Sequence, residues 1–485
     1  RLMGELSGDL ISYITLRNKS LLFQFMQSMV APLSPPPRDL VIASQSSPWS
    51  IIWKMLGVVI LLYIIAQAFF GVVFGFFIGD AFTAIFSMFC LVPLLAIFGY
   101  IRRPKLTHII LAVPDPSGNT SHRLPNSRVL NTPVPTRFSH HLIIDSPPLE
   151  MPRSSSIWLI FGITITISFC GLLPMMIFED PLWVLLAFFV GIPAWLLGFS
   201  LPVHAWWSFS NRHFQLITKR RDGESMLIAG MLSTLPAIVI NSLLIQIFLV
   251  FIGKESMDPA TNGEFLILAV SAPVGEELCK AAFVLSLYKL IDSPKRGFQI
   301  GFSVGLGFAL LENLQYILMS FGALEYSAIS FSFTAIVRGI GSIPGHAFWT
   351  GISGVSIGWY LCRMRGTNLA GNPNEASNWM VYDSNTGMVV SEKKDSSFMS
   401  NTISNWLDKP VQKTWQLPKN PIVGISIAII GHSFWNGSSW LVSYLFRDFD
   451  ILVGFIATLV WILVLIGGLW YIGREILSSV KHLPS

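Results

Sequence analysis

Long runs of apolar residues recur along this chain and constrain its fold more than any other feature. A helix needs about 20 apolar residues to cross the hydrocarbon core of a bilayer. Only 12% of the 485 residues are charged, against about 25% in soluble domains. We therefore expect an all-α polytopic membrane protein with about 10 transmembrane helices, which lie approximately at 51–78, 81–101, 157–178, 182–207, 225–252, 263–290, 298–322, 328–362, 421–446 and 449–473.

The segment 328–362 is too long for one straight helix. Pro344 removes a backbone donor, and Gly339, Gly341 and Gly345 lie beside it. The sequence therefore predicts that this segment is divided into two helical pieces near Pro344.

The distribution of Lys and Arg predicts the orientation, because basic residues gather in cytoplasmic loops. If the N-terminus is inside and the spans alternate, only Lys254 and Arg447 of the 32 basic residues lie in outside loops. Both termini are therefore expected in the cytoplasm. The net charge of +5 follows from these inside loops and requires no nucleic-acid partner.

The spans also suggest a division of the chain. We expect a cytoplasmic N-terminal segment at 1–50, membrane helices at 51–252 with a cytoplasmic loop at 102–156, a second membrane domain at 263–473 with a cytoplasmic loop at 363–420, and a cytoplasmic tail at 474–485.

Both long loops contain β-like patches. The first has them at 108–113 and 141–144, and the second has Trp379 to Tyr382 and Met388 to Val390 around a turn with Gly387, which predicts a small β-hairpin. The loops could recruit a substrate, regulate the protein or simply connect helices, and the residues leave this open.

Seven ionisable residues inside the apolar segments cluster within 263–446. Such groups are costly to bury in lipid, so they usually face a protein interior and carry function. Their clustering predicts a polar reaction chamber built from four neighbouring helices. The residues are Glu276, Glu277, Lys280, Glu312, Arg338, His346 and His432.

The first group is Glu276-Glu277-Leu-Cys-Lys280. Positions three and four apart share a helix face, so Lys280 can reach both carboxylates. A buried ion pair that only locks helix packing would need a single carboxylate. The next segment adds Glu312 with Asn313 beside it, and the small residues Gly301, Gly305 and Gly307 precede them and allow close helix approach.

A short string then occurs twice. Gly-His346-Ala-Phe-Trp-Thr350-Gly lies in one segment and Gly-His432-Ser-Phe-Trp-Asn436-Gly lies in the next. In each string the His and the polar residue four positions later share a face. Two histidines in matched contexts favour a functional role over two unrelated core histidines.

Glutamate and histidine together can deprotonate water or hold a metal, and histidine with asparagine can donate hydrogen bonds to an oxyanion. The sequence has no His-Glu-x-x-His motif. The residues therefore favour hydrolysis by an activated water inside the membrane.

The order Glu-Glu-x-x-Lys, Phe-x-x-x-Glu-Asn, a His in a Gly-rich helix and His-x-x-x-Asn resembles the PrsW family of the CAAX-prenyl endopeptidase, Abi or CPBP superfamily, over 263–446. CAAX-type relatives have Arg after the Glu pair and His in place of Glu312, so this chain follows the PrsW pattern. The resemblance implies an intramembrane endopeptidase of a prokaryotic plasma membrane, acting on a membrane-anchored protein substrate in the lipid bilayer.

The resemblance also implies roles for the residues. Glu276 would be the principal base, with Glu312 as a second water-activating group, and His432 with Asn436 would form the oxyanion site. His346 would be a further polar ligand or donor, Glu277 and Lys280 would orient the set, and Asn313 and Arg338 would support it. No cofactor is certain, but zinc could be held by Glu276, Glu312, His346 and His432.

Two other functions remain open from the residues. A non-catalytic scaffold or sensor would keep the polar core for packing, and an ion- or proton-coupled transporter would use it as a relay. The two halves of the chain show no inverted repeat, which disfavours transport. A Glu276→Gln variant would separate a protease from a scaffold. The residues do not predict the substrate or the oligomeric state.

Overall fold

A computed structural model describes residues 42–123, 129–144, 147–178, 181–241, 245, 262–322, 326–366, 379–382, 406–407 and 415–484. The chain divides into two compact units. One contains Arg1–Ala43, Gly99–Pro147 and Asn378–Met380, and the other contains Ser44–Phe98, Pro148–Ser377 and Val381–Ser485.

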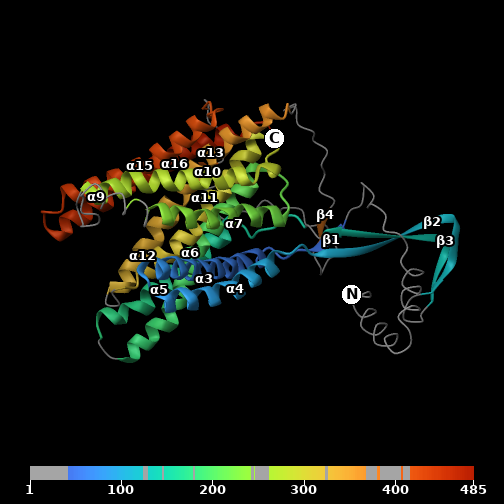
Figure 1. Cartoon of the computed structure of the whole chain (residues 1–485), viewed down its shortest axis with the longest axis horizontal. Helices are drawn as coiled ribbons and strands as arrows, with labels where there is room; N and C mark the ends of the chain where they lie inside the picture. Colours follow the sequence, from blue (N-terminus) through green and yellow to red (C-terminus); the bar gives the residue numbers. More distant parts are fainter. Residues whose placement is uncertain are drawn as a thin grey trace. The chain divides into compact units, whose positions relative to one another are not determined.

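The first unit is dominated by a long β-hairpin (Figure 1). Strands β2 (Leu106–Arg123) and β3 (Val129–Ile144) pair antiparallel, with Leu106 opposite Ile144 and an irregular register between Pro114 and Ser121. The β-like patches predicted in the loop 102–156 thus belong to strands much longer than the patches.

Two short strands form a separate two-stranded sheet, β1 (Ile42–Gln45) and β4 (Trp379–Tyr382). The strand predicted at Trp379 to Tyr382 is therefore confirmed. Its partner is β1, and the segment 388–390, predicted as the other strand of a hairpin, lies outside the described residues.

The second unit is helical (Figure 1). Among the described residues, its α-helices are α3 (Ser50–Ile78), α4 (Ala81–Arg102), α5 (Ser154–Leu172), α6 (Pro181–Phe214), α7 (Arg220–Val239), α9 (Asn262–Phe265), α10 (Ala272–Ser286), α11 (Pro294–Met319), α12 (Ser327–Val337), α13 (Ile343–Met364), α15 (Pro421–Leu445) and α16 (Ile451–Lys481). Side-chain caps define two of the starts: Asn420 accepts from the Ile422 N–H of α15, and Asp450 accepts from the Leu452 N–H of α16.

Within the described residues, six helical segments are long and apolar enough to cross a membrane, so the chain is an integral multi-pass membrane protein. They are Ser50–Ile78, Ala81–Arg102, Ser154–Met176, Trp183–Phe214, Pro294–Met319 and Ile451–Lys481. Each corresponds to a predicted span. The other four predicted spans contain α7, α10, α12 with α13, and α15, which are shorter or more polar.

The long segment 328–362 is interrupted near Pro344, as predicted, but the chain stays helical. Residues Arg338–Ser342 form a π-helical turn between α12 and α13. A second π-helical segment, Leu266–Ser271, leads into α10. Such turns shift the backbone hydrogen bonds and are frequent at functional sites.

Side chains from neighbouring helices satisfy carbonyls in both π-helical segments. Trp206 Nε1 donates to Gly339 O at 3.0 Å, and Trp470 Nε1 donates to Ile340 O at 2.7 Å. In the other segment, Leu268 O accepts from a helix α15 side chain at 3.0 Å. These contacts fix backbone that a regular helix would have paired internally.

Helix α11 lies at the centre of the helical unit, and 72% of the residues in its most apolar stretch are buried. A Cβ on Gly301 or Gly305 would collide with backbone carbonyls of α13, and a Cβ on Gly307 would collide with the Leu227 carbonyl of α7. The close approach predicted from these glycines is confirmed. It brings the polar residues of α11 and α13 within hydrogen-bonding distance.

Candidate functional site

Lys280 lies at the centre of the polar cluster. Its Nζ donates to Glu277 Oε1 at 2.8 Å and to Glu276 Oε2 at 3.2 Å, both on α10. It also contacts His346 Nδ1 of α13 at 2.9 Å, and it lies 3.8 Å above the ring centre of Phe308. The side chain has no exposed surface, so its charge is balanced entirely by these partners.

Glu277 is fully enclosed. Its Oε1 accepts from Lys280 and lies 3.1 Å from His432 Nδ1 of α15, and its Oε2 accepts from Thr350 Oγ1 of α13 at 3.2 Å. The side chain is 0% exposed. Both oxygens of this carboxylate are therefore engaged, and Glu277 ties α10, α13 and α15 together.

His346 is held from both sides of its ring. Because a charged lysine can only donate, Nδ1 accepts from Lys280, and Nε2 must then carry the proton. Nε2 lies 3.1 Å from Glu312 Oε2, which accepts that proton in a hydrogen bond. These partners assign a neutral His346 with its proton on Nε2.

Glu312 connects this histidine to the π-helical turn. Its Oε2 also accepts from Arg338 Nη2 at 2.8 Å, and Arg338 Nε donates to Asn313 Oδ1. The guanidinium carbon lies 3.8 Å from the ring centre of Tyr316. Glu312 and Arg338 are 21% and 17% exposed, so this side of the cluster is more open than the Lys280 side.

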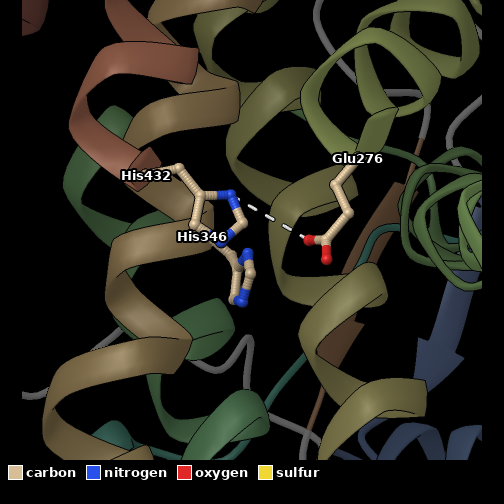
Figure 2. A group of neighbouring side chains, drawn as sticks. All are labelled: Glu276, His346 and His432. Atoms are coloured by element: carbon tan, nitrogen blue, oxygen red, sulfur yellow. Dashed lines mark ion pairs between the residues drawn. The ribbon is translucent and has the colours of Figure 1, made fainter. Parts of the chain in front are cut away.

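Glu276 differs from its neighbour Glu277, whose two oxygens are both engaged. Figure 2 shows its carboxylate facing His432 and His346. Its Oε2 lies 4.0 Å from His432 Nδ1. Among the described residues, Oε1 of Glu276 accepts no hydrogen bond, and the side chain is 12% exposed. Within the α10 pair, Glu276 is thus the carboxylate with a free oxygen, and among the described residues Oε1 of Glu312 on α11 is also without a hydrogen bond.

Aromatic rings enclose the histidines. Trp349 stacks on His432 with ring centres 4.7 Å apart, and His346 meets His432 edge to face at 4.9 Å. Gly345 and Gly431 leave room for this tryptophan, since a Cβ on either would lie within 3 Å of it. The repeated Gly-His-small-Phe-Trp strings therefore shape the histidine pocket by packing.

The matched strings differ in what their polar residues do. Thr350 donates to Glu277, whereas Asn436 Nδ2 donates to Leu268 O of the π-helical segment at 3.0 Å. The structure thus brings Glu276, Glu277, Lys280, Glu312, Asn313, Arg338, His346 and His432 together, and places the Asn436 amide against backbone. Sequence reasoning assigned Thr350 no role, although its place one turn after His346 was a signal.

Three residues offer ligand atoms suitable for a metal. Atoms of Glu276, His346 and His432 all lie within 4.8 Å of one another. One carboxylate and two imidazoles is a set that catalytic zinc uses. The three carboxylates carry three negative charges, and Lys280 and Arg338 carry two positive charges. With both histidines neutral, the cluster has one net negative charge, which also favours binding of a cation. His346 would have to give up one of its two present contacts.

Comparison with known proteins adds one match. Residues 225–374 match the model of the PrsW family, described as intramembrane metalloproteases. The matched range includes Glu276, Glu312 and His346, but His432 lies beyond its end. No curated protein and no solved structure matches the chain.

Proposed function

Because residues 225–374 form a PrsW family intramembrane metalloprotease domain, and such enzymes are peptidases, we propose that this chain hydrolyses a peptide bond in or near the transmembrane segment of a membrane-anchored protein. The attacking water is activated at Glu276. The observation that carries this proposal is the free, partly exposed oxygen of Glu276 beside two histidines.

The reaction requires a base, and Glu276 is suited to it. Its free oxygen accepts a proton from water while the water oxygen bonds to the peptide carbonyl carbon. The C–N bond of the tetrahedral intermediate then breaks, and the amine nitrogen receives the proton that Glu276 holds. The products are an amine and a carboxylic acid, which ionises by releasing its proton to water, and Glu276 returns to its starting state.

The other residues hold Glu276 in place. Lys280 binds both carboxylates of the pair, and Glu277 holds Lys280 and His432. Preorganised groups of this kind need no rearrangement during the reaction, which is the main source of electrostatic catalysis.

A divalent metal ion fits the same place. Glu276, His346 and His432 would hold it, and zinc is our choice from the ligand types. When bound, the ion would polarise the water and favour its deprotonation.

For the polar cluster to lie within the membrane, the four more polar predicted spans must cross it as well. We propose ten crossings in all, with α7, α10, α12 with α13, and α15 adding to the six apolar segments. The cluster residues lie on α10, α11, α13, α15 and the π-helical turn before α13, which enclose them so that the lipid does not have to solvate their charges.

Glu276→Gln is the decisive variant. It keeps the size of the side chain and a partner for Lys280 but cannot accept a proton. We expect complete loss of cleavage when purified protein in detergent is tested on a panel of single-span membrane proteins. We also expect a thermal unfolding midpoint close to that of the wild type. Cleavage at the wild-type rate would rule out the proposed base.

Glu277→Gln is the matched comparison, because the same change is made one residue away. Both oxygens of Glu277 are engaged in a fully buried cluster. Breaking a buried ion pair costs about 3–5 kcal/mol, so this variant should unfold at clearly lower temperature. If both variants were equally stable and equally active, the cluster would be a packing device, as in a scaffold protein.

A further inference from the structure

We propose that Arg338 is the catalytic residue that binds the oxyanion formed during peptide hydrolysis, through its Nη1 group. The proposal rests on the function proposed above, since it assumes that a peptide carbonyl is attacked near Glu276. It assigns to Arg338 the role that the sequence resemblance implied for Asn436 with His432.

The guanidinium of Arg338 is fixed along one edge. Nε donates to Asn313 and Nη2 donates to Glu312, so the edge formed by these two nitrogens faces α11. The Tyr316 ring covers one face of the group at 3.8 Å. Within the described residues, Nη1 has no partner, and the side chain is 17% exposed.

The backbone of Arg338 is equally well held. It begins the π-helical turn Arg338–Ser342, whose carbonyls at Gly339 and Ile340 accept from Trp206 and Trp470. A donor that is fixed before the reaction stabilises developing charge without a reorganisation cost.

Arg338 also lies next to the residues that activate water. Glu312 Oε2 accepts from both Arg338 Nη2 and His346 Nε2, so a single atom separates the guanidinium from the histidine. His346 belongs to the same group of ligand atoms as Glu276. The proposed role requires a substrate carbonyl whose oxygen lies beside Nη1 and whose carbon is reached by the water at Glu276.

The other candidate donors are already used. Lys280 has three N–H groups, and Glu276, Glu277 and His346 accept them in a fully buried setting. The Asn436 amide donates to Leu268 O. His432 Nδ1 faces Glu277 at 3.1 Å, which leaves its other nitrogen without a proton when the ring is neutral.

The first test uses cleavage of the panel substrates by Arg338→Ala, Arg338→Lys and Asn436→Ala. Loss of one oxyanion donor lowers kcat about 100- to 1,000-fold. We expect that loss in Arg338→Ala, with little change in KM, and partial recovery on adding guanidinium ion. Arg338→Lys should retain part of the activity, and Asn436→Ala should keep kcat within about tenfold of the wild type. A larger loss in Asn436→Ala than in Arg338→Ala would overturn the proposal.

The second test does not depend on cleavage. A product carboxylate carries its negative oxygen where the oxyanion forms, so an acetylated leucine- and alanine-containing tetrapeptide with a free carboxylate should bind more tightly than its amide. We expect a preference of about tenfold or more, as for hydrogen bonds to charged groups, and its disappearance in Arg338→Ala.

Two results separate this proposal from the proposed function. If Glu276→Gln is inactive but Arg338→Ala cleaves normally, the protease function stands and the role of Arg338 falls. If Arg338→Ala is inactive, is not recovered by guanidinium, and unfolds well below the wild type, Arg338 has a structural role only. Equal binding of the two peptides by the wild type also contradicts the proposal.

Discussion

At the scale of single residues, Lys280 sets the arrangement of the whole cluster. Its three N–H groups determine which carboxylate oxygens stay free and which nitrogen of His346 carries a proton. The only free carboxylate oxygen of the α10 pair, within the described residues, is on Glu276. Two glutamates that are adjacent in sequence therefore have different surroundings, and this difference separates a base from an orienting group.

The contacts of Lys280 with its own helix follow from sequence spacing, because residues three and four apart share a face. The contact with His346 does not, because it depends on how closely α13 approaches α10. The same holds for Thr350 and Asn436, which occupy matching places in two similar strings. Their partners, Glu277 and Leu268, lie on a helix and a π-helical segment whose positions the strings do not encode.

The metal proposal is also decided at this scale. We expect about one zinc ion per chain in the purified protein, and its loss in His432→Ala, which removes a ligand. Elemental analysis measures this directly. His108→Ala is the matched control, because that histidine lies on the β2–β3 hairpin. Chelation should abolish cleavage and added zinc should restore it.

The contrary result has a clear meaning. If the wild type holds no zinc and chelators leave cleavage intact while Glu276→Gln is inactive, Glu276 activates water without a metal. Lys280 would then be the cation that balances the α10 carboxylates.

At the scale of elements, the site depends on how closely α11 and α13 approach each other. Gly305→Ala should force the helices apart, because its Cβ would collide with the His346 carbonyl. That movement would separate Glu312 from His346 and should lower both cleavage and the unfolding midpoint. Overpacking of this kind costs about 1–3 kcal/mol.

Gly57→Ala is the matched control in α3. A Cβ at Gly57 would meet nothing within 4 Å, and alanine favours a helix by about 0.5–1 kcal/mol relative to glycine. The control should therefore be as active as the wild type and slightly more stable. A Gly305→Ala protein with normal activity and stability would show that the close approach is not needed.

The elements differ in how well the sequence predicts them. Gly301, Gly305 and Gly307 pointed to a close helix contact, and the structure confirms it. Pro344 and its glycines predicted the interruption of 328–362, but not that the interruption would be a π-helical turn. Such a turn depends on outside donors, here Trp206 and Trp470, which come from helices distant in sequence.

At the scale of the whole molecule, apolar length in the part of the chain that the structure describes identifies six of the ten proposed crossings. The four helical regions that fail this criterion include those that carry Glu276, His346 and His432. The failure has a physical reason, since a helix that lines a polar site must exchange apolar residues for polar ones and small ones. The helices most important for function are thus the hardest to recognise as membrane spans.

Ten crossings with the N-terminus inside make a prediction about the two sides of the membrane. The β2–β3 hairpin should face the cytoplasm, and the turn between α15 and α16 should face the outside. Ser117→Cys in the hairpin and Asp448→Cys in the turn place exposed thiols at these two points. A membrane-impermeant maleimide added to intact cells should label only Asp448→Cys.

Permeabilised cells provide the control, because both variants should then be labelled. The parent protein, with its four cysteines, gives the background. The helical regions between the two points are α5, α6, α7, α10, α11, α12 with α13, and α15. If all of them cross the membrane, the number of crossings is odd and the two points lie on opposite sides. If one of the polar regions did not cross, both points would lie on the same side and would label alike. Labelling of both variants, or of neither, in intact cells would therefore contradict the ten-span arrangement, and with it the placement of the cluster inside the membrane.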